Sequence, residues 1–210
     1  MREISPYTAS SNNHYITLGK MKAMGPHVFD PKNIPVLEDE NRRVWQDPEK
    51  ILAMIEIKPS YIAADLGCGS GFFTVPLSQK VKKVYGIDVQ KEMLDFLGEK
   101  IRKLKIENVE LLLSKGDEIP LENKSVDLLI SVNTLHEFDS KEKMIQELKR
   151  VLKEGGRVMI LDFKKEETGF GPPVTIRVAR DEATSLFKKK GFTLSQTQDL
   201  RYHYLLVFSK

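Results

Sequence analysis

The clearest chemical signal in the sequence is an acidic residue followed by a glycine-rich loop. Asp65 lies near the end of an apolar run, and Gly67, Gly69 and Gly71 then alternate with other residues before the next helical stretch. In an open α/β sheet such a turn lies at the carboxyl ends of the strands, where ligands bind. Glycines allow a ligand to approach the backbone closely, although a tight strand-to-helix turn alone would also explain them.

The spacing of the glycines separates two classes of ligand. A dinucleotide-binding loop reads G-x-G-x-x-G, which would require its third glycine at the position of Phe72. Here the third glycine comes one residue earlier, at Gly71. The Asp65 carboxylate would also repel a pyrophosphate, whereas it suits a ligand that carries an ammonium group. A nicotinamide-dependent oxidoreductase is therefore disfavoured, and it stays as the first alternative.

A second acidic residue, Asp88, ends the next apolar run, Tyr85–Asp88. An acid at the end of the second strand of such a sheet accepts hydrogen bonds from ribose hydroxyls. Taken alone, Asp88 would also be explained as a turn residue at the surface. One acid for an amine and one for a ribose together fit S-adenosylmethionine better than NAD.

From residue 61 onward, short apolar runs alternate with longer amphipathic ones. The predicted strands cover 61–66, 83–87, 109–113, 126–132, 157–162, 193–199 and 203–209, and the predicted helices cover 72–79, 90–104, 141–152 and 180–190. This alternation favours crossover units and a parallel sheet. Only a short turn separates the last two strands, which predicts an antiparallel hairpin at the sheet edge.

The first 46 residues differ from the rest of the chain. We expect residues 1–25 to be loose and residues 26–46 to form an arm with one short helix near 36–44. Asp47, Pro48 and Glu49 predict the start of a further helix, because they suit the cap, the first helical position and the positive helix end. We therefore divide the chain into an arm or lid, 1–46, and a cofactor-binding domain, 47–210.

Four motifs follow one another within residues 47–162, namely DLGCGSGFFT, YGIDVQKEML, SVDLLISVNTLHEF and LKRVLKEGGRVMILDF. In this order they resemble the class I S-adenosylmethionine-dependent methyltransferases, and among them the small-molecule group of the ubiquinone and menaquinone biosynthesis enzymes, the type 11 methyltransferases. The resemblance implies a Rossmann-like α/β fold with seven strands in the order 3-2-1-4-5-7-6, strand 7 antiparallel and helices on both faces. It also implies methyl transfer from S-adenosylmethionine to a small-molecule acceptor, with release of S-adenosylhomocysteine.

The resemblance further implies roles for individual residues. Asp65 would bind the amino group of the cofactor through water, and Asp88 would bind the ribose. Val89 would pack on the adenine, and Met93 would line the same pocket. The backbone of the glycine loop would hold the methionine part: Gly67, Cys68, Gly69 and Gly71.

The chain departs from the family in the third acidic motif, which normally supplies an aspartate to the adenine amino group. An alignment on Ile119–Pro120 puts Lys115 at the position of that aspartate and leaves a backbone contact from Gly116. A shift of two residues puts Asp117 there instead. The sequence leaves both alignments open.

The segment after the fourth predicted strand would face the cofactor. The resemblance implies that this loop contacts the methionine part and the acceptor, and we assign Asn133 to the former. His136 is the candidate general base, with an unperturbed pKa near 6.5, although a helix cap or a loop hydrogen bond would explain it equally well. His27 lies on the arm beside Phe29 and Asp30, where a surface position is the simpler explanation.

Composition excludes several other functions. The 210 residues include 33 Lys and Arg against 30 Asp and Glu, a net charge of +3 with the two signs intermixed, and no Asn-Pro-Pro-Tyr run is present, so a nucleic-acid substrate is disfavoured. A single cysteine, Cys68, permits no disulfide and no thiol relay, and no cluster of ligands has metal spacing. Without a membrane-length apolar run or a signal-like N-terminus, we expect a cytoplasmic protein. A non-catalytic cofactor-binding module, a homodimer and the identity of the acceptor stay open.

Overall fold

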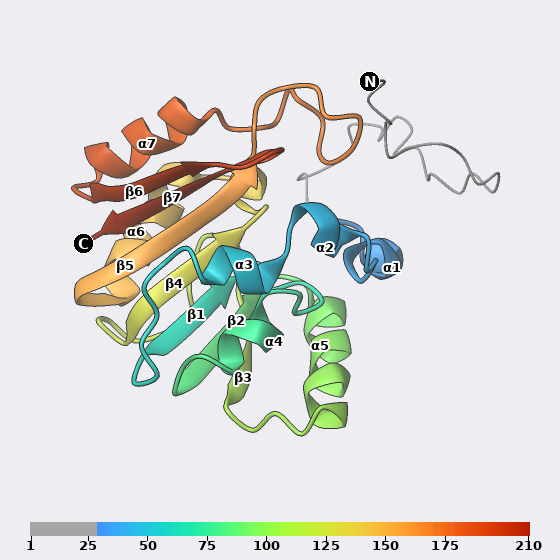
Figure 1. Cartoon of the computed structure of the whole chain (residues 1–210). Helices are drawn as coiled ribbons and strands as arrows, with labels where there is room; N and C mark the ends of the chain where they lie inside the picture. Colours follow the sequence, from blue (N-terminus) through green and yellow to red (C-terminus); the bar gives the residue numbers. More distant parts are fainter. Residues whose placement is uncertain (1–28) are drawn as a thin grey trace, which may run out of the picture.

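A seven-stranded sheet in the order β3-β2-β1-β4-β5-β7-β6 forms the centre of the molecule (Figure 1). The computed structural model describes residues 29–210, so the expectations for residues 1–25 and for His27 lie outside the described residues. The strands are β1 (Ile62–Leu66), β2 (Lys83–Asp88), β3 (Val109–Leu113), β4 (Val126–Val132), β5 (Leu152–Phe163), β6 (Thr193–Asp199) and β7 (His203–Ser209). Strands β1 to β5 are parallel, and β7 is antiparallel to β5 and β6. The predicted strand order and the terminal hairpin are confirmed.

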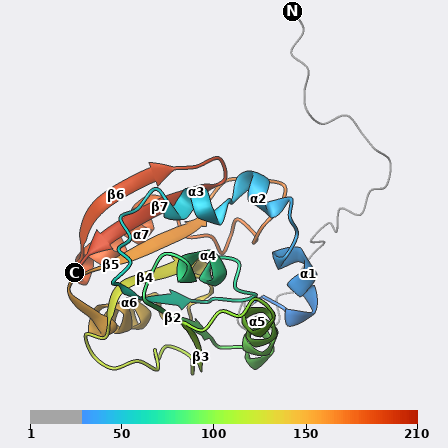
Figure 2. The same ribbon diagram turned by 60° about the horizontal axis from the view of Figure 1, so that its bottom comes forward.

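Helices cover both faces of this sheet. They are α1 (Ile34–Leu37), α2 (Arg42–Trp45), α3 (Pro48–Leu52), α4 (Thr74–Ser78), α5 (Lys91–Lys103), α6 (Lys141–Val151) and α7 (Arg180–Lys189). Side chains of α3 and α4 form one apolar core with the sheet, and side chains of α6 and α7 form the other (Figures 1 and 2). Among the described helices, none combines the length and the apolar character that a membrane crossing requires.

The central strands are buried from both sides, which explains their continuous apolar sequences. In β4, Leu128, Leu129 and Ile130 are at most 1% exposed. Because successive side chains of a strand point to opposite faces, Leu129 joins the core under α6 and α7, whereas Leu128 and Ile130 join the core under α3 and α4. This burial holds the carboxyl ends of β1, β2, β4 and β5 in fixed positions at one edge of the sheet.

The arm differs from its prediction. Instead of one helix near 36–44, it contains a 3-10 turn (Pro31–Asn33) and the two short helices α1 and α2. The break between them has a local cause, because the Asp39 side chain accepts hydrogen bonds from both the backbone and the side-chain nitrogen of Asn41, each at 2.9 Å. In Figure 1 both helices lie beyond the carboxyl ends of the parallel strands.

Two other boundaries also differ from the sequence prediction. Strand β5 begins at Leu152 rather than at residue 157, because the pairing with β4 continues through an irregularity that contains Gly155 with φ of 71°. Helix α4 is shorter than the predicted 72–79 and starts at Thr74. The helix start predicted at Asp47 is confirmed, since its carboxylate accepts a hydrogen bond from the Lys50 backbone nitrogen at 3.2 Å.

Candidate active site

The glycine loop between β1 and α4 has a backbone that only glycine adopts readily. Gly67, Gly69 and Gly71 have φ values of 74°, 50° and 82°. A Cβ atom on Gly67 would collide with the side chain of Thr134, and one on Gly71 would collide with Leu97. The tight turn after β1 alone therefore requires these glycines, whether or not a ligand also approaches the loop.

Asp65 lies at the bottom of this loop and is 1% exposed. Its carboxylate accepts a hydrogen bond of 2.6 Å from the Thr74 hydroxyl. Burial, together with repulsion from Asp88, raises the pKa of Asp65 to about 7, although the Thr74 hydrogen bond and the charge of Arg42 oppose this rise. An ammonium group of a ligand next to Asp65 would favour the ionised carboxylate and so lower this raised pKa.

Asp88, at the end of β2, lies beside the same loop. Its two carboxylate oxygens each accept one backbone hydrogen bond of 2.9 Å, from Gly69 and from Gln90. Each oxygen keeps a further lone pair for a hydroxyl group. Burial raises the pKa of Asp88, although the backbone hydrogen bonds oppose the rise. Val89 beside it is 46% exposed, whereas Met93 is 2% exposed and lies in the protein interior.

The segment after β3 contains the two alternatives for the adenine contact. The Asp117 carboxylate accepts a hydrogen bond of 3.4 Å from the Ser140 backbone nitrogen, and so lies near the start of α6. Lys115 is exposed and pairs through its backbone with Glu118. Gly116, with φ of 59°, has open space where a Cβ atom would be. The choice between the two alignments stays a prediction.

His136 lies in the 3-10 turn Leu135–Glu137 after β4 and pairs with a buried carboxylate. Its Nδ1 atom is 2.9 Å and 3.1 Å from the two oxygens of Asp162, which is fully buried at the end of β5. Burial lowers the pKa of His136, but the Asp162 charge and hydrogen bond outweigh it, so that the pKa is raised. The helix-cap explanation for His136 is wrong, because the N-cap of the next helix, α6, is Ser140. Glu137 beside it has a pKa raised to about 7 by burial.

Asn133 directly follows β4 and has a left-handed conformation, with φ of 56°. Its Nδ2 atom donates a hydrogen bond of 3.3 Å to the Gln46 side-chain oxygen. Its Oδ1 atom is buried and has no hydrogen-bond partner among residues 29–210. A buried acceptor without a donor favours a ligand group at this position.

Gln46, which the sequence analysis did not single out, links the arm to the site. It is fully buried, and its oxygen also accepts a hydrogen bond of 2.8 Å from Arg42. Because the Gln46 side-chain oxygen accepts hydrogen bonds from Arg42 and Asn133, the other end of the amide is the Nε2 donor, and Gln46 Nε2 donates to His203 Nε2, 3.3 Å away. His203 is stacked on Trp45 with an interplanar angle of 3°, and burial lowers its pKa to about 3. No sequence pattern marks these contacts.

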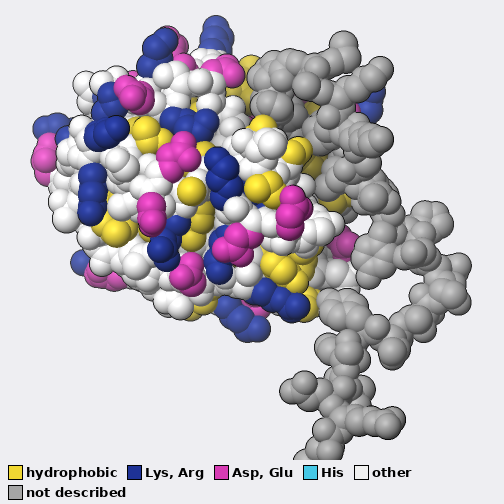
Figure 3. Space-filling model, turned by 90° about the horizontal axis from the view of Figure 1, so that it is seen from above, with side chains coloured by type: hydrophobic (Ala, Val, Ile, Leu, Met, Phe, Trp, Pro, Cys, Tyr) yellow, Lys and Arg dark blue, Asp and Glu magenta, His cyan; other side chains and the backbone are white. Residues whose placement is uncertain are grey.

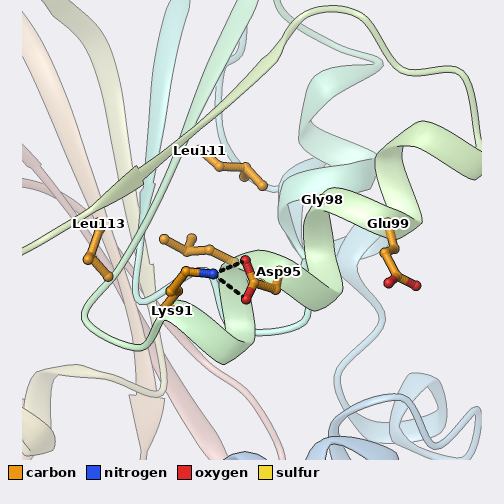
Figure 4. Close-up of a pocket in the computed structure, with 7 residues that line it drawn as sticks. Lys91, Asp95, Gly98, Glu99, Leu111 and Leu113 are labelled. Carbon is orange, nitrogen blue, oxygen red and sulfur yellow. Dashed lines mark hydrogen bonds and ion pairs between the residues drawn. The ribbon is translucent and has the colours of Figure 1, made fainter.

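A groove of about 710 Å³ lies elsewhere, between α5 and the edge strand β3. Figure 4 shows Leu111 and Leu113 of β3 opposite the ion pair of Lys91 and Asp95, whose nearest atoms are 2.6 Å apart. The groove adjoins the site at Leu113, which is the register partner of Asp88. In the part of the chain that the structure describes, no group of three His, Cys, Asp or Glu residues could hold a metal ion.

Comparisons with known proteins agree with this architecture. Residues 64–160 match the model of a methyltransferase domain. The crystal structure of an S-adenosylmethionine-dependent methyltransferase from Aquifex aeolicus is 35% identical, covers 87% of this chain and 99% of its own, and superposes with a TM-score of 0.83. That of a putative type 11 methyltransferase from Sulfolobus solfataricus is 30% identical, with coverages of 83% and 91% and a TM-score of 0.62.

A demethylmenaquinone methyltransferase from Bacillus mycoides (strain KBAB4) is 28% identical over 130 residues, or 60% of this chain. The chain spans 54% of the length of that relative. The sheet order and the acid–glycine–acid site define an α/β domain that binds a nucleoside cofactor. The chain belongs to the family of S-adenosylmethionine-dependent methyltransferases. The resemblance in the four motifs is confirmed, and S-adenosylmethionine is the cofactor of this family.

Proposed function

We propose that this protein transfers a methyl group from S-adenosylmethionine to a small-molecule acceptor and releases S-adenosylhomocysteine. The observation that carries the proposal is the convergence of Asp65, Asp88 and His136 on one edge of the sheet, around the glycine loop. The cofactor, when bound, supplies an activated methyl group on a positively charged sulfur. The protein then has to bind, orient and exclude water, because in-line positioning supplies much of the rate.

In this proposal the acidic residues bind the polar groups of the cofactor. Asp65 binds the amino group, and Asp88 uses its remaining lone pairs for the ribose hydroxyls. The exposed Val89 side chain offers an apolar surface to the adenine, and the buried Met93 lines the same pocket. The loop backbone follows the methionine part, and Asn133 Oδ1 accepts a hydrogen bond from the same part. Gly116 and Asp117 remain the two candidates for the adenine edge.

His136 serves as the general base wherever the acceptor must lose a proton. Because Nδ1 donates to Asp162, the ring presents Nε2 as its accepting nitrogen, and Nε2 has no hydrogen-bond partner among the described residues. Asp162 is thus a positioning residue that fixes the tautomer and the ring plane. Its charge also raises the basicity of His136. The base is available above the raised pKa and is lost as the pH falls through it.

The arm serves as the lid of the acceptor site. Three contacts between the arm and the rest of the domain support this role: Gln90 Nε2 donates to the Phe29 carbonyl at 2.8 Å, the Lys100 ammonium of α5 lies 2.7 Å from the Glu38 carboxylate, and Gln46 contacts Asn133. A lid of this kind excludes water from the reacting groups.

The surface and the composition support a small-molecule acceptor and a cytoplasmic location. On the face shown in Figure 3, the Lys and Arg side chains are interspersed with those of Asp and Glu, whereas a nucleic-acid substrate favours a one-sided basic patch. The demethylmenaquinone methyltransferase relative also acts, by its name, on a small molecule. The single cysteine, Cys68, is buried and requires no oxidising compartment, which supports a cytoplasmic location.

Calorimetry with the full chain tests the proposal. We expect S-adenosylhomocysteine to bind in the micromolar range, equivalent to about −8 kcal/mol, and NAD not to bind at millimolar concentration. Asp88→Asn should weaken S-adenosylhomocysteine by roughly 1–3 kcal/mol, because an amide replaces one of the oxygens that accept hydrogen bonds. Asp95→Asn, an exposed acid on α5, serves as the matched control and should change nothing. Binding of NAD without S-adenosylhomocysteine would contradict the proposal.

A further inference from the structure

We propose that Arg42 of α2 binds the carboxylate of the methionine part of the cofactor, so that the arm completes the cofactor site as well as covering it. This inference rests on the proposed function, because it assumes that Asp65 receives the ammonium group of the same amino acid. A free amino acid group carries both charges. Asp65 at the end of β1 would pair with the ammonium group only. The carboxylate of the ligand would then lack a charged partner, and a cation close by would stabilise it.

Arg42 is held directly against the glycine loop. Its guanidinium carbon lies 4.1 Å from the ring centre of Phe72, the residue that follows Gly71. A guanidinium at this distance stacks on the aromatic face, which fixes its plane and leaves its edge available for hydrogen bonds. Phe72 is 8% exposed. The stack thus joins the arm to the segment along which the methionine part is expected to lie.

The hydrogen bonds of Arg42 leave several of its terminal N–H groups available. A guanidinium has five N–H donors. One, on Nε, donates to the Gln46 oxygen at 2.8 Å, and another, on Nη1, donates to the Leu37 carbonyl at 3.1 Å. The other donors, including both on Nη2, have no acceptor among residues 29–210. Two parallel N–H groups are what a carboxylate accepts best from arginine.

The charges around Arg42 also favour an anionic ligand. Burial lowers the pKa of Arg42 to about 10, whereas the charges of Glu38 and Asp65 oppose this, so the side chain is cationic at neutral pH. Glu38 is already paired with Lys100, 2.7 Å away. Asp65 and Arg42 are close enough for the charge of each to shift the pKa of the other, so a carboxylate and a guanidinium lie near one another beside the glycine loop.

The neighbouring arginine provides a matched control. Arg43 also lies over Phe72, with its guanidinium carbon 5.3 Å from the ring centre. However, its Nη1 atom is paired with the Glu49 carboxylate at 2.8 Å, and about half of its side chain is exposed. The two residues have the same charge and the same aromatic partner, and they differ in burial and in whether an acidic side chain already pairs with them.

The test compares two ligands by calorimetry on the full chain. S-Adenosylhomocysteine carries the carboxylate, whereas its methyl ester has the same adenosine and amino group without that charge. For the wild type we expect the ester to bind about ten- to a hundredfold more weakly, as for a lost charged hydrogen bond. Arg42→Gln should lower the affinity for S-adenosylhomocysteine by a similar factor and should bind both ligands equally. Arg43→Gln should behave as the wild type.

The outcomes are distinct. If Arg42→Gln still prefers S-adenosylhomocysteine over the ester by the factor seen in the wild type, the inference is wrong. Arg42→Lys keeps the positive charge but lacks the paired N–H groups of a guanidinium, so it should retain part of the preference for S-adenosylhomocysteine. This variant replaces Arg42→Gln in the comparison if the glutamine variant does not fold. If the wild type binds both ligands equally well, the inference about Arg42 is also wrong, although the proposed function stands. If the wild type binds neither ligand, the proposed function itself fails.

Discussion

The buried carboxylate of Asp65 should make the free protein less stable as the pH rises. Burial raises its pKa from 3.8 to about 7. Between these two values the folded protein keeps a proton that the unfolded chain releases. The contribution of Asp65 to the free energy of unfolding is therefore complete below pH 4, decreases from about pH 4 to about pH 7, and is constant above.

Replacement of Asp65 by Asn removes this titration and preserves the shape of the side chain. The amide oxygen still accepts the hydrogen bond from the Thr74 hydroxyl. A difference of about three pKa units corresponds to about 4 kcal/mol, at 1.36 kcal/mol per unit. We expect Asp65→Asn to be more stable than the wild type by up to about 4 kcal/mol at pH 8, and this advantage to disappear near pH 4.

Urea denaturation of the cofactor-free protein, from pH 4 to pH 8.5, measures this difference. The exposed acid Asp95 supplies the control, because Asp95→Asn should follow the wild-type profile. The same Asp65→Asn variant should bind S-adenosylhomocysteine at least about tenfold more weakly, since the ammonium group loses its charged partner. If the Asp65→Asn and wild-type profiles run parallel across the whole range, Asp65 does not titrate as argued, and the reasoning from burial is wrong.

Two further predictions concern the glycine loop and the histidine pair. Gly71→Ala should lower the free energy of unfolding by about 2–5 kcal/mol in urea denaturation, because a collision of its Cβ atom with Leu97 adds to the strain of positive φ. Gly116→Ala, also at positive φ but in open space, should cost only about 1–2 kcal/mol. The pKa of His136, measured by NMR titration of its ring, should lie above 6.5 in the wild type and below 6.5 in Asp162→Asn, because burial then acts without the opposing carboxylate. An unchanged pKa in that variant would show that Asp162 does not set the basicity of the ring.

The sheet could be predicted from the sequence because its signals are local. Each parallel strand is a short apolar run, and the acids and glycines at the ends of β1 and β2 show which end of the sheet binds ligands. The hairpin of β6 and β7 followed from the short turn between them. The start of β5 could not be predicted, since its first residues pair with β4 across the irregularity at Gly155, and that pairing depends on the neighbouring strand.

The pairing of His136 with Asp162 was not predictable by the same means. Sequence reasoning found His136 as a loop residue and had no partner for it. The partner lies at the end of another strand, and the pair forms only because β4 and β5 are adjacent and Asp162 faces the side on which His136 lies. The sequence does contain one signal for this pair, because the predicted strand 157–162 ends in the acidic residue Asp162, at the same end of the sheet as His136.

The arm was the least predictable part of the proposed site, because its contacts join residues far apart in the sequence. Gln46 contacts His203, a residue 157 positions away, and a single buried amide leaves no pattern in a sequence. The amide oxygen accepts hydrogen bonds from Arg42 and Asn133, and the amide nitrogen donates one hydrogen bond to His203. Arg42 lies against the glycine loop, whereas Asn133 and His203 lie at the ends of β4 and β7. One side chain therefore connects the side proposed for the cofactor with the side proposed for the acceptor. Arg42 belongs to the arm itself, so displacement of the arm would leave two groups of the remaining domain, the Asn133 amide and His203 Nε2, without their Gln46 partner. This cost supports the proposal that the arm forms a wall of the site.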